Sequence, residues 1–266
     1  MRRASARWYR AAMYPIADAV LRLPTPLIVL ILLAGWGGVA FAIHRWIVPR
    51  LCGPDGRRLG RFEAEVTSQI ALAFGLLISF NAVWVWDRGD RVREAVLAEA
   101  AALESVLDEA DFSEDAGFRS RSHALVHAYA RHLIDEEWPQ LSQSRAKLDQ
   151  PAPLLELRRF AAKSSDEVRD AVQRAADARE TRVRDGQMTM PRSRWLIVFV
   201  LAVLTLVSIG SLHGDSPRGR ALALALVTLA IACCFTVLFV SGRPFIGDYA
   251  IRPDDLAAIA ERAGRP

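Results

Sequence analysis

The amino-acid sequence predicts an all-α membrane protein with four transmembrane helices and a cytoplasmic helical domain inserted between spans two and three. Four apolar runs, residues 27–43, 66–86, 195–212 and 221–240, support the four spans, because a helix needs about 20 mainly apolar residues to cross the hydrocarbon core. Hydrophobic residues make up 52% of the chain, yet charged residues still reach 24% and are concentrated outside these runs. That combination is typical of a membrane protein with a substantial part outside the bilayer.

The first run, residues 27–43, follows a segment of residues 1–26 that we expect to be cytoplasmic. No small-residue cleavage site follows the run, and His44, Arg45 and Trp46 stand there instead. This argues against a secretory signal peptide. Residues 44–65 are expected to form the first external loop.

The second run, residues 66–86, contains 21 residues without a charge and ends abruptly at Asp87 and Arg88. Several polar residues lie inside it, namely Thr67, Ser68, Gln69, Ser79 and Asn81. Polar side chains at that depth usually face other helices or a water-filled path. We expect Asn81 to form an inter-helix polar contact, worth about 1 kcal/mol or less, rather than to contact an ion.

The segment of residues 87–194 is predicted to be the cytoplasmic helical domain, because its apolar residues recur mostly at steps of three and four. No proline separates the second run from Ala110, so one helix is expected to continue from the span into this domain. A break is predicted at residues 111–117. A second helix is expected over 118–138 and a third over 154–184.

The remaining chain supplies the second pair of spans, residues 195–212 and 221–240, with a short external loop at 213–220 and a cytoplasmic tail at 241–266. Four spans place both termini and the long middle segment on one side of the membrane. Arginines flank the spans on that side at the following positions: 2, 3, 7, 10, 22, 88, 91, 93, 182, 184, 192, 194, 243 and 252. The positive-inside bias therefore predicts that this side is cytoplasmic.

Composition and motifs predict neither an enzyme nor a cofactor site. The sequence has no glycine-rich phosphate loop, no Gly-x-Ser-x-Gly elbow and no His-Glu-x-x-His pair. His123 and His127 are one helical turn apart and could supply two metal ligands, but no convincing further ligand set accompanies them, so we expect a solvated or interfacial surface and no metal. Cys52, Cys233 and Cys234 match no zinc or disulfide spacing. The net charge of +4 is small and its arginines are spread over all connections, which gives no support to nucleic-acid binding.

Within the second run, Leu72, Leu76 and Phe80 form an apolar stripe at steps of four. From the sequence alone, lipid contact or helix packing is the favoured interpretation of this stripe. Such a stripe becomes a gate only if symmetry brings several copies around one axis, where a narrow apolar ring blocks ions by dewetting.

The chain resembles the bestrophin-like family of uncharacterised bacterial membrane proteins and, more distantly, the bestrophin anion channels. The resemblance covers about residues 27–256. It is carried by Gly75-Leu76-Leu77-Ile78-Ser79-Phe80 followed by Asp87-Arg88, by an Arg-aromatic entry to the second pair of spans, and by Arg243-Pro244-Phe245-Ile246-Gly247 with Ile251-Arg252-Pro253.

The resemblance implies a homo-oligomeric, pentameric channel for small anions in the bacterial cytoplasmic (inner) membrane, with the lipid bilayer as its surroundings. It places the pore constriction at Leu72, Leu76 and Phe80, and Asp87 with Arg88 at the cytoplasmic end of the pore helix, as a hinge or an ion pair. Leucine stands at the upper two positions where bestrophins usually have Ile or Phe, and the acidic cluster of the animal calcium clasp has no counterpart here. The alternative is a non-conducting membrane scaffold or sensor whose cytoplasmic helices bind a partner or anionic lipid.

Overall fold

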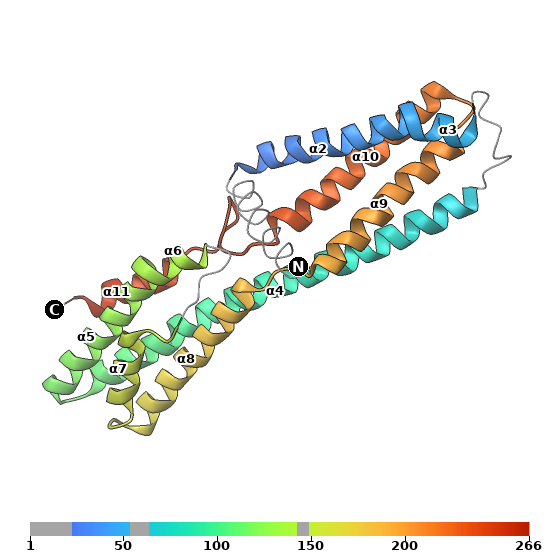
Figure 1. Ribbon diagram of the computed structural model, residues 1–266. Helices are drawn as coiled ribbons and strands as arrows, with labels where there is room; N and C mark the ends of the chain where they lie inside the picture. The colour runs from blue at the N-terminus through green and yellow to red at the C-terminus, as the bar shows by residue number, and fades with distance from the viewer. Residues whose placement is uncertain (1–22, 54–63, 143–148, 266) are drawn as a thin grey trace, which may run out of the picture. The chain divides into compact units, whose positions relative to one another are not determined.

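The computed structural model describes residues 23–53, 64–142 and 149–265 (Figure 1). These residues form helices and connections without a β-strand, which confirms the predicted all-α class. Most of the predicted segment 1–26 and residues 54–63 of the predicted loop 44–65 lie outside the described residues. The helices form two units, which we call the apolar unit (described residues 23–86 and 189–242) and the polar unit (described residues 87–188 and 243–265).

The apolar unit contains the candidate membrane spans. Its elements are α2 (Thr25–Ala42), the π-helix η1 (Ile43–Ile47), α3 (Val48–Cys52), the first part of α4 (Ala64–Phe112), α9 (Arg192–Leu212) and α10 (Pro217–Val240). Among the described residues, four helices are long and apolar enough to cross a membrane: 25–52, 64–112, 192–212 and 217–240. The prediction of four spans is confirmed at this level, and the first helix continues beyond the predicted end at residue 43 to Cys52.

Aromatic and small side chains hold the apolar unit together. The ring of Trp36 on α2 lies 5.1 Å from that of Phe199 on α9 and 4.9 Å from that of Phe235 on α10, measured between centroids. A Cβ atom at Gly210 of α9 would lie 2.9 Å from a methyl group of Val48, so α9 and α3 approach closely because this position has no side chain.

Each π-helical segment of the chain's described part ends two residues before a proline. After η1, the N–H of Val48 donates to the carbonyl of Ile43, five residues back, and Pro49 follows. After η2 (Leu133–Glu137), Trp138 donates in the same way to Leu133, one residue before Pro139. A proline ring crowds the carbonyl four residues before it, and the wider turn accommodates the ring while the helix continues.

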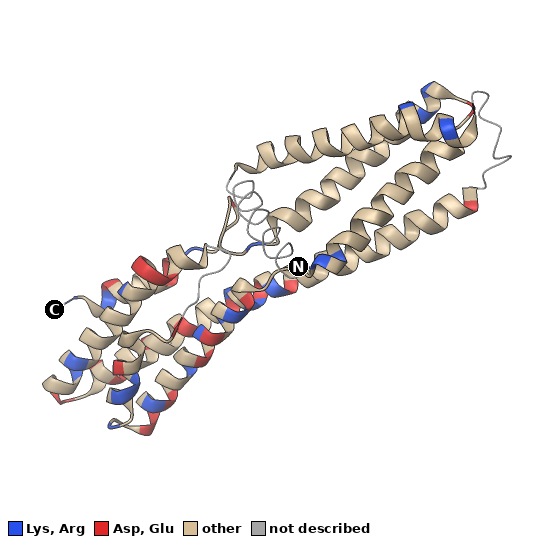
Figure 2. Ribbon diagram, viewed as in Figure 1, with Lys and Arg blue, Asp and Glu red and all other residues tan. Residues whose placement is uncertain are grey.

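The polar unit contains the rest of α4, α5 (Ala116–His132), η2, α6 (Trp138–Leu141), α7 (Ala152–Ala161), α8 (Asp166–Gln187) and α11 (Asp254–Ala263). Charged residues are frequent along these helices and rare along the apolar ones (Figure 2). The continuation of the second span is confirmed, because α4 runs without interruption to Phe112. The predicted break follows, and the Asp115 side chain caps α5 by accepting from the N–H of Gly117 at 2.7 Å.

The predicted helix over residues 154–184 is wrong in one respect, since the structure divides it into α7 and α8. A turn after Ala161 separates the two helices, and the side chain of Ser165 accepts from the N–H of Val168 at the start of α8. A serine cap of this kind satisfies a backbone donor that a continuous helix would have paired internally.

The core of the polar unit joins five helices. It is made of buried apolar residues from α4, α5, α7, α8 and α11, among them Leu103, Leu107, Leu125, Leu157, Val172 and Leu256. Leu103 and Leu107 of α4 belong to the repeat of apolar residues, at steps of three and four, that predicted this helix.

Candidate functional site

The predicted constriction residues lie together on an uncovered face of α4. The side chains of Leu72, Leu76 and Phe80 are 72%, 56% and 65% exposed in the single chain. Phe74 and Ile78, on another face of the same helix, are buried against the neighbouring candidate spans. Leaving apolar surface in water costs a free energy of about 25 cal/mol per Å² relative to burying it. The stripe therefore requires lipid or another protein surface to cover it.

Asn81 is buried, with 3% of its surface exposed. Its side-chain amide donates to the carbonyl of Leu77, one turn earlier in the same helix, at 2.8 Å. The hydrogen bond that the structure gives this residue is thus within α4. The predicted inter-helix contact would use the amide oxygen or the second N–H of the Asn81 side chain, and it stays a prediction.

Asp87 and Arg88 lie within α4, which continues past them. Asp87 is exposed, whereas Arg88 is completely buried and donates to the carbonyl of Met188. Burial, together with the positive charge of Arg243, lowers the pKa of Arg88 to about 10, so the side chain remains charged at neutral pH. Arg88 thereby ties α4 to the end of α8 within the polar unit.

His123 and His127 contact separate partners. The imidazole of His123 lies 2.8 Å from a carboxylate oxygen of Asp111, and Nδ1 of His127 lies 2.9 Å from the carbonyl oxygen of Ala260. Both histidines join α5 to its neighbours, as the interpretation of an interfacial surface expects.

Comparison with models of known protein families identifies the family of this chain. The model of the Bestrophin-like domain matches residues 38–256, which is most of the sequence. The chain belongs to the bestrophin-like family. The resemblance predicted from the second-span and C-terminal motifs is therefore confirmed.

Solved structures show that this bestrophin-like chain shares its fold with known membrane proteins. One is a variant of a bacterial bestrophin homologue from Klebsiella pneumoniae, with 14% identity, a TM-score of 0.56, and coverage of 90% of this chain and 94% of the other. A second, a variant described only as a membrane protein, has 14% identity and a TM-score of 0.55, with coverage of 90% and 96%. A search of curated proteins found no match.

The motif at residues 243–247 of the bestrophin-like chain docks the C-terminal segment into the polar unit. Phe245 is buried, its ring lies edge-on to Trp138 at a centroid distance of 5.3 Å, and it contacts the backbone position of Gly186 so closely that a Cβ there would collide with the ring. Gly247 has φ of 92°, a conformation that glycine adopts without steric cost. The turn returns the chain so that Ile251 donates to the carbonyl of Pro244 at 2.8 Å.

A buried charge cluster in the bestrophin-like chain was missed by the sequence analysis. Arg182 donates to Glu99 at 2.7 Å and to Glu137 at 2.6 Å, and all three side chains are almost fully buried. Arg179 also binds Glu137, and the Tyr129 hydroxyl donates to Glu99 at 2.6 Å. Two carboxylates and two guanidinium groups balance the charge of the cluster.

The electrostatics of the cluster follow from this geometry. Burial alone would lower the pKa of Arg182, but the adjacent carboxylates of Glu99 and Glu137 raise it above its ordinary value. Burial and the negative charge of Glu99 raise the pKa of Tyr129 well above its ordinary value. Arg182 therefore stays charged and Tyr129 stays neutral near neutral pH, so this part of the cluster orients helices rather than transferring protons.

The sequence did hold a signal for this cluster. Glu99 occupies an apolar-face position of α4, between the buried Val96 and Leu103, and Arg182 continues the buried row of α8 after Ala175 and Arg179. A charged residue at an apolar position of a helix predicts a buried partner. The identity of that partner depends on the tertiary structure.

Proposed function

We propose that this protein is an oligomeric channel in the bacterial cytoplasmic (inner) membrane that passes small anions, with the first half of α4 lining the pore. The observation that carries the proposal is the uncovered stripe of Leu72, Leu76 and Phe80 on a helix that packs against the neighbouring spans through Phe74 and Ile78. Membership of the bestrophin-like family supports the choice of a channel. In a pentamer, the number that the resemblance suggests, five stripes would surround one axis.

In this arrangement the stripe forms three apolar rings spaced by one helical turn. A narrow apolar ring raises the free energy of a hydrated ion because it offers no groups to replace the lost water. Asn81 would add an inter-helix polar contact beside the rings. Both termini and the polar unit would lie in the cytoplasm, in keeping with the arginine-rich flanks.

Anion passage is supported by the family resemblance. Asp90 and Glu94 follow the stripe on the exposed surface of α4, and carboxylate rings favour cations in pores. The test of the proposal therefore has to measure the flux of halide and of potassium on the same preparation.

The experiment is reconstitution of the purified full chain into liposomes, with halide and potassium flux recorded for wild type, Leu76→Ala and Phe80→Ala. Leu226→Ala on α10 is the matched control, because Leu226 is a similarly exposed apolar residue, at 61%, on another candidate span. If truncation lowers the barrier by about 1.4 kcal/mol, flux rises about tenfold. Leu226→Ala should leave flux unchanged.

The outcomes separate the parts of the proposal. An absence of flux in wild type and both stripe variants would favour a non-conducting scaffold. Potassium flux without halide flux would contradict anion passage and would still support a channel. Equal flux in all four proteins would show that the stripe does not line the pore.

A further inference from the structure

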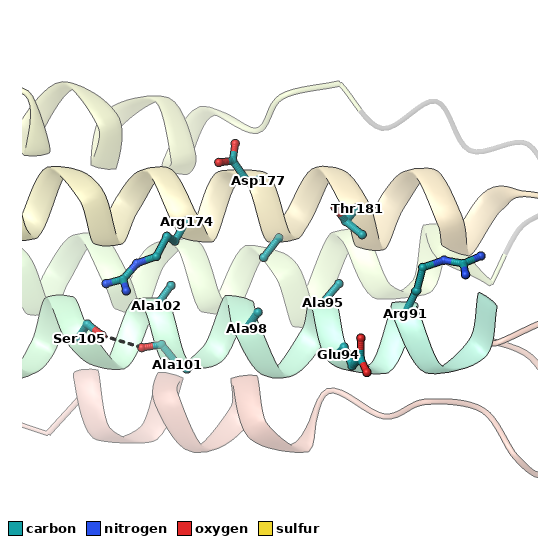
Figure 3. Close-up of a pocket in the computed structure, with 11 residues that line it drawn as sticks. Arg91, Glu94, Ala95, Ala98, Ala101, Ala102, Ser105, Arg174, Asp177 and Thr181 are labelled. Carbon is teal, nitrogen blue, oxygen red and sulfur yellow. Dashed lines mark hydrogen bonds between the residues drawn. The ribbon is translucent and has the colours of Figure 1, made fainter. Parts of the chain in front are cut away.

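An open groove runs between α4 and α8 in the polar unit (Figure 3). Its volume is about 680 Å³. Alanines form much of its lining, namely Ala95, Ala98, Ala101 and Ala102 from α4 and Ala178 from α8. Arg174 and Asp177 of α8 lie along its rim. Small side chains on two adjacent helices leave room for a larger side chain from outside.

A projecting apolar side chain lies on the next face of the same helix, beside the groove. Leu97 is 49% exposed and stands about 100° around α4 from Ala98. Glu104, two turns after Leu97 and therefore on the same edge, reaches Arg262 of α11. The polar unit thus presents a leucine on the α11 side of α4 and an alanine groove on the α8 side.

We propose that these two edges are the halves of one subunit interface, in which Leu97 of each copy inserts into the alanine groove of the next copy. The proposal rests on the proposed function, because it assumes a homo-oligomer. Different patches on the two sides make the contact head-to-tail, and a head-to-tail contact that closes produces a ring. A ring is the arrangement that a central pore requires.

The charges on the two edges are complementary. α8 runs antiparallel to α4, as the pairs Arg91–Asp185 and Arg182–Glu99 show. In the direction from residue 91 to residue 105 of α4, the groove therefore presents Arg91 and Glu94 first, then Asp177 near Ala98, and then Arg174. In the same direction the leucine edge presents Arg93 before Leu97 and Glu104 after it. Arg93 of one copy can then meet Glu94 and Asp177 of the next, and Glu104 can meet Arg174, while Arg91 of the groove is already paired with Asp185. Opposite charges therefore favour this register.

The first test measures the mass of the full chain in detergent for wild type, Ala98→Trp and Leu97→Asp. Ala98→Trp fills the groove, and Leu97→Asp places a charge in it. Leu155→Asp on α7, where Leu155 is 37% exposed, is the control for an added surface charge. We expect wild type and Leu155→Asp to be oligomers, and the other two variants to shift to the mass of a single chain with unchanged helical circular dichroism.

A second test does not depend on weakening the assembly. In a chain whose Cys52, Cys233 and Cys234 are replaced, Leu97→Cys combined with Thr181→Cys places one thiol on each edge, since Thr181 lines the groove. A short bis-maleimide should then give a ladder of covalently linked copies that ends at the size of the ring, and either cysteine alone should give no ladder.

The results distinguish the two proposals. The proposed interface is wrong if Ala98→Trp and Leu97→Asp assemble like wild type and the double-cysteine chain gives no ladder. That result would not affect the proposed channel. A wild-type protein that is a single chain in detergent and in liposomes overturns both.

Discussion

Replacing Arg182 with methionine tests the buried charge cluster most directly. The substitution keeps a long, flexible side chain of similar shape over the ring of Trp138, which the guanidinium group now covers at 5.2 Å. It removes the hydrogen bonds to Glu99 and Glu137. Glu137 keeps Arg179, at 2.7 Å, whereas Glu99 keeps only the hydroxyl of Tyr129 among the described contacts.

The magnitude follows from what a carboxylate does when it is buried without a cation. Such a group takes up a proton rather than remain charged. The reference pKa of a glutamate side chain is about 4.3, so holding one protonated at pH 7 costs about 4 kcal/mol. This agrees with the roughly 3–5 kcal/mol lost when one partner of a buried ion pair is removed. For a chain of this size, such a loss lowers the unfolding midpoint by roughly 8–16 °C.

The loss should depend on pH with a definite sign. In the variant, the folded state would bind a proton that the unfolded state releases above about pH 4.3. The deficit relative to wild type should therefore shrink by about 1.4 kcal/mol for each pH unit of acidification from pH 7 towards pH 4.3.

The assay is thermal unfolding in detergent followed by tryptophan fluorescence, at pH 7 and pH 5. Arg169→Met is the matched control, since Arg169 pairs with Asp166 on the surface of the same helix α8 and an exposed pair contributes about 1 kcal/mol or less. Equal unfolding temperatures for Arg182→Met and Arg169→Met would contradict the predicted role of the buried ion pairs. A deficit of Arg182→Met that is as large at pH 5 as at pH 7 would contradict it as well.

Two further predictions concern the packing of the C-terminal segment. Gly186→Ala should destabilise the protein by about 1–3 kcal/mol, because the added methyl group collides with the ring of Phe245. Gly89→Ala is the control, since a methyl group there meets open space and should not destabilise the protein. Equal unfolding midpoints for the two variants would contradict this packing. Hydrogen bonds from Arg262 lower the pKa of Asp111, so the stabilisation is complete above the unfolded pKa and is lost as the pH falls through the folded one. Arg262→Ala should therefore expose α11 to limited proteolysis at pH 7, wild type should reach the same sensitivity only on acidification, and equal cleavage at pH 7 would count against the contact.

Local patterns predicted much of the fold. The length of each apolar run identified four helices able to span a membrane, and the absence of proline after Trp86 predicted the extension of α4, which ends at Phe112. These features depend on residues close together in the chain. The division between α7 and α8 was missed because Ser165 acts as a cap only if the chain turns there, and the apolar period continues across the break.

Hydropathy, helical period and short motifs are properties of neighbouring residues, and they were enough to predict the helical class, the apolar helices and the family. The faces of those helices that are covered became evident only once the helices were packed together. It left Leu72, Leu76 and Phe80 exposed, and it brought Glu99, Glu137 and Arg182 from three separate helices into one buried cluster. Burial and ion pairing depend on distances between segments far apart in the chain, and helical periodicity does not encode those distances.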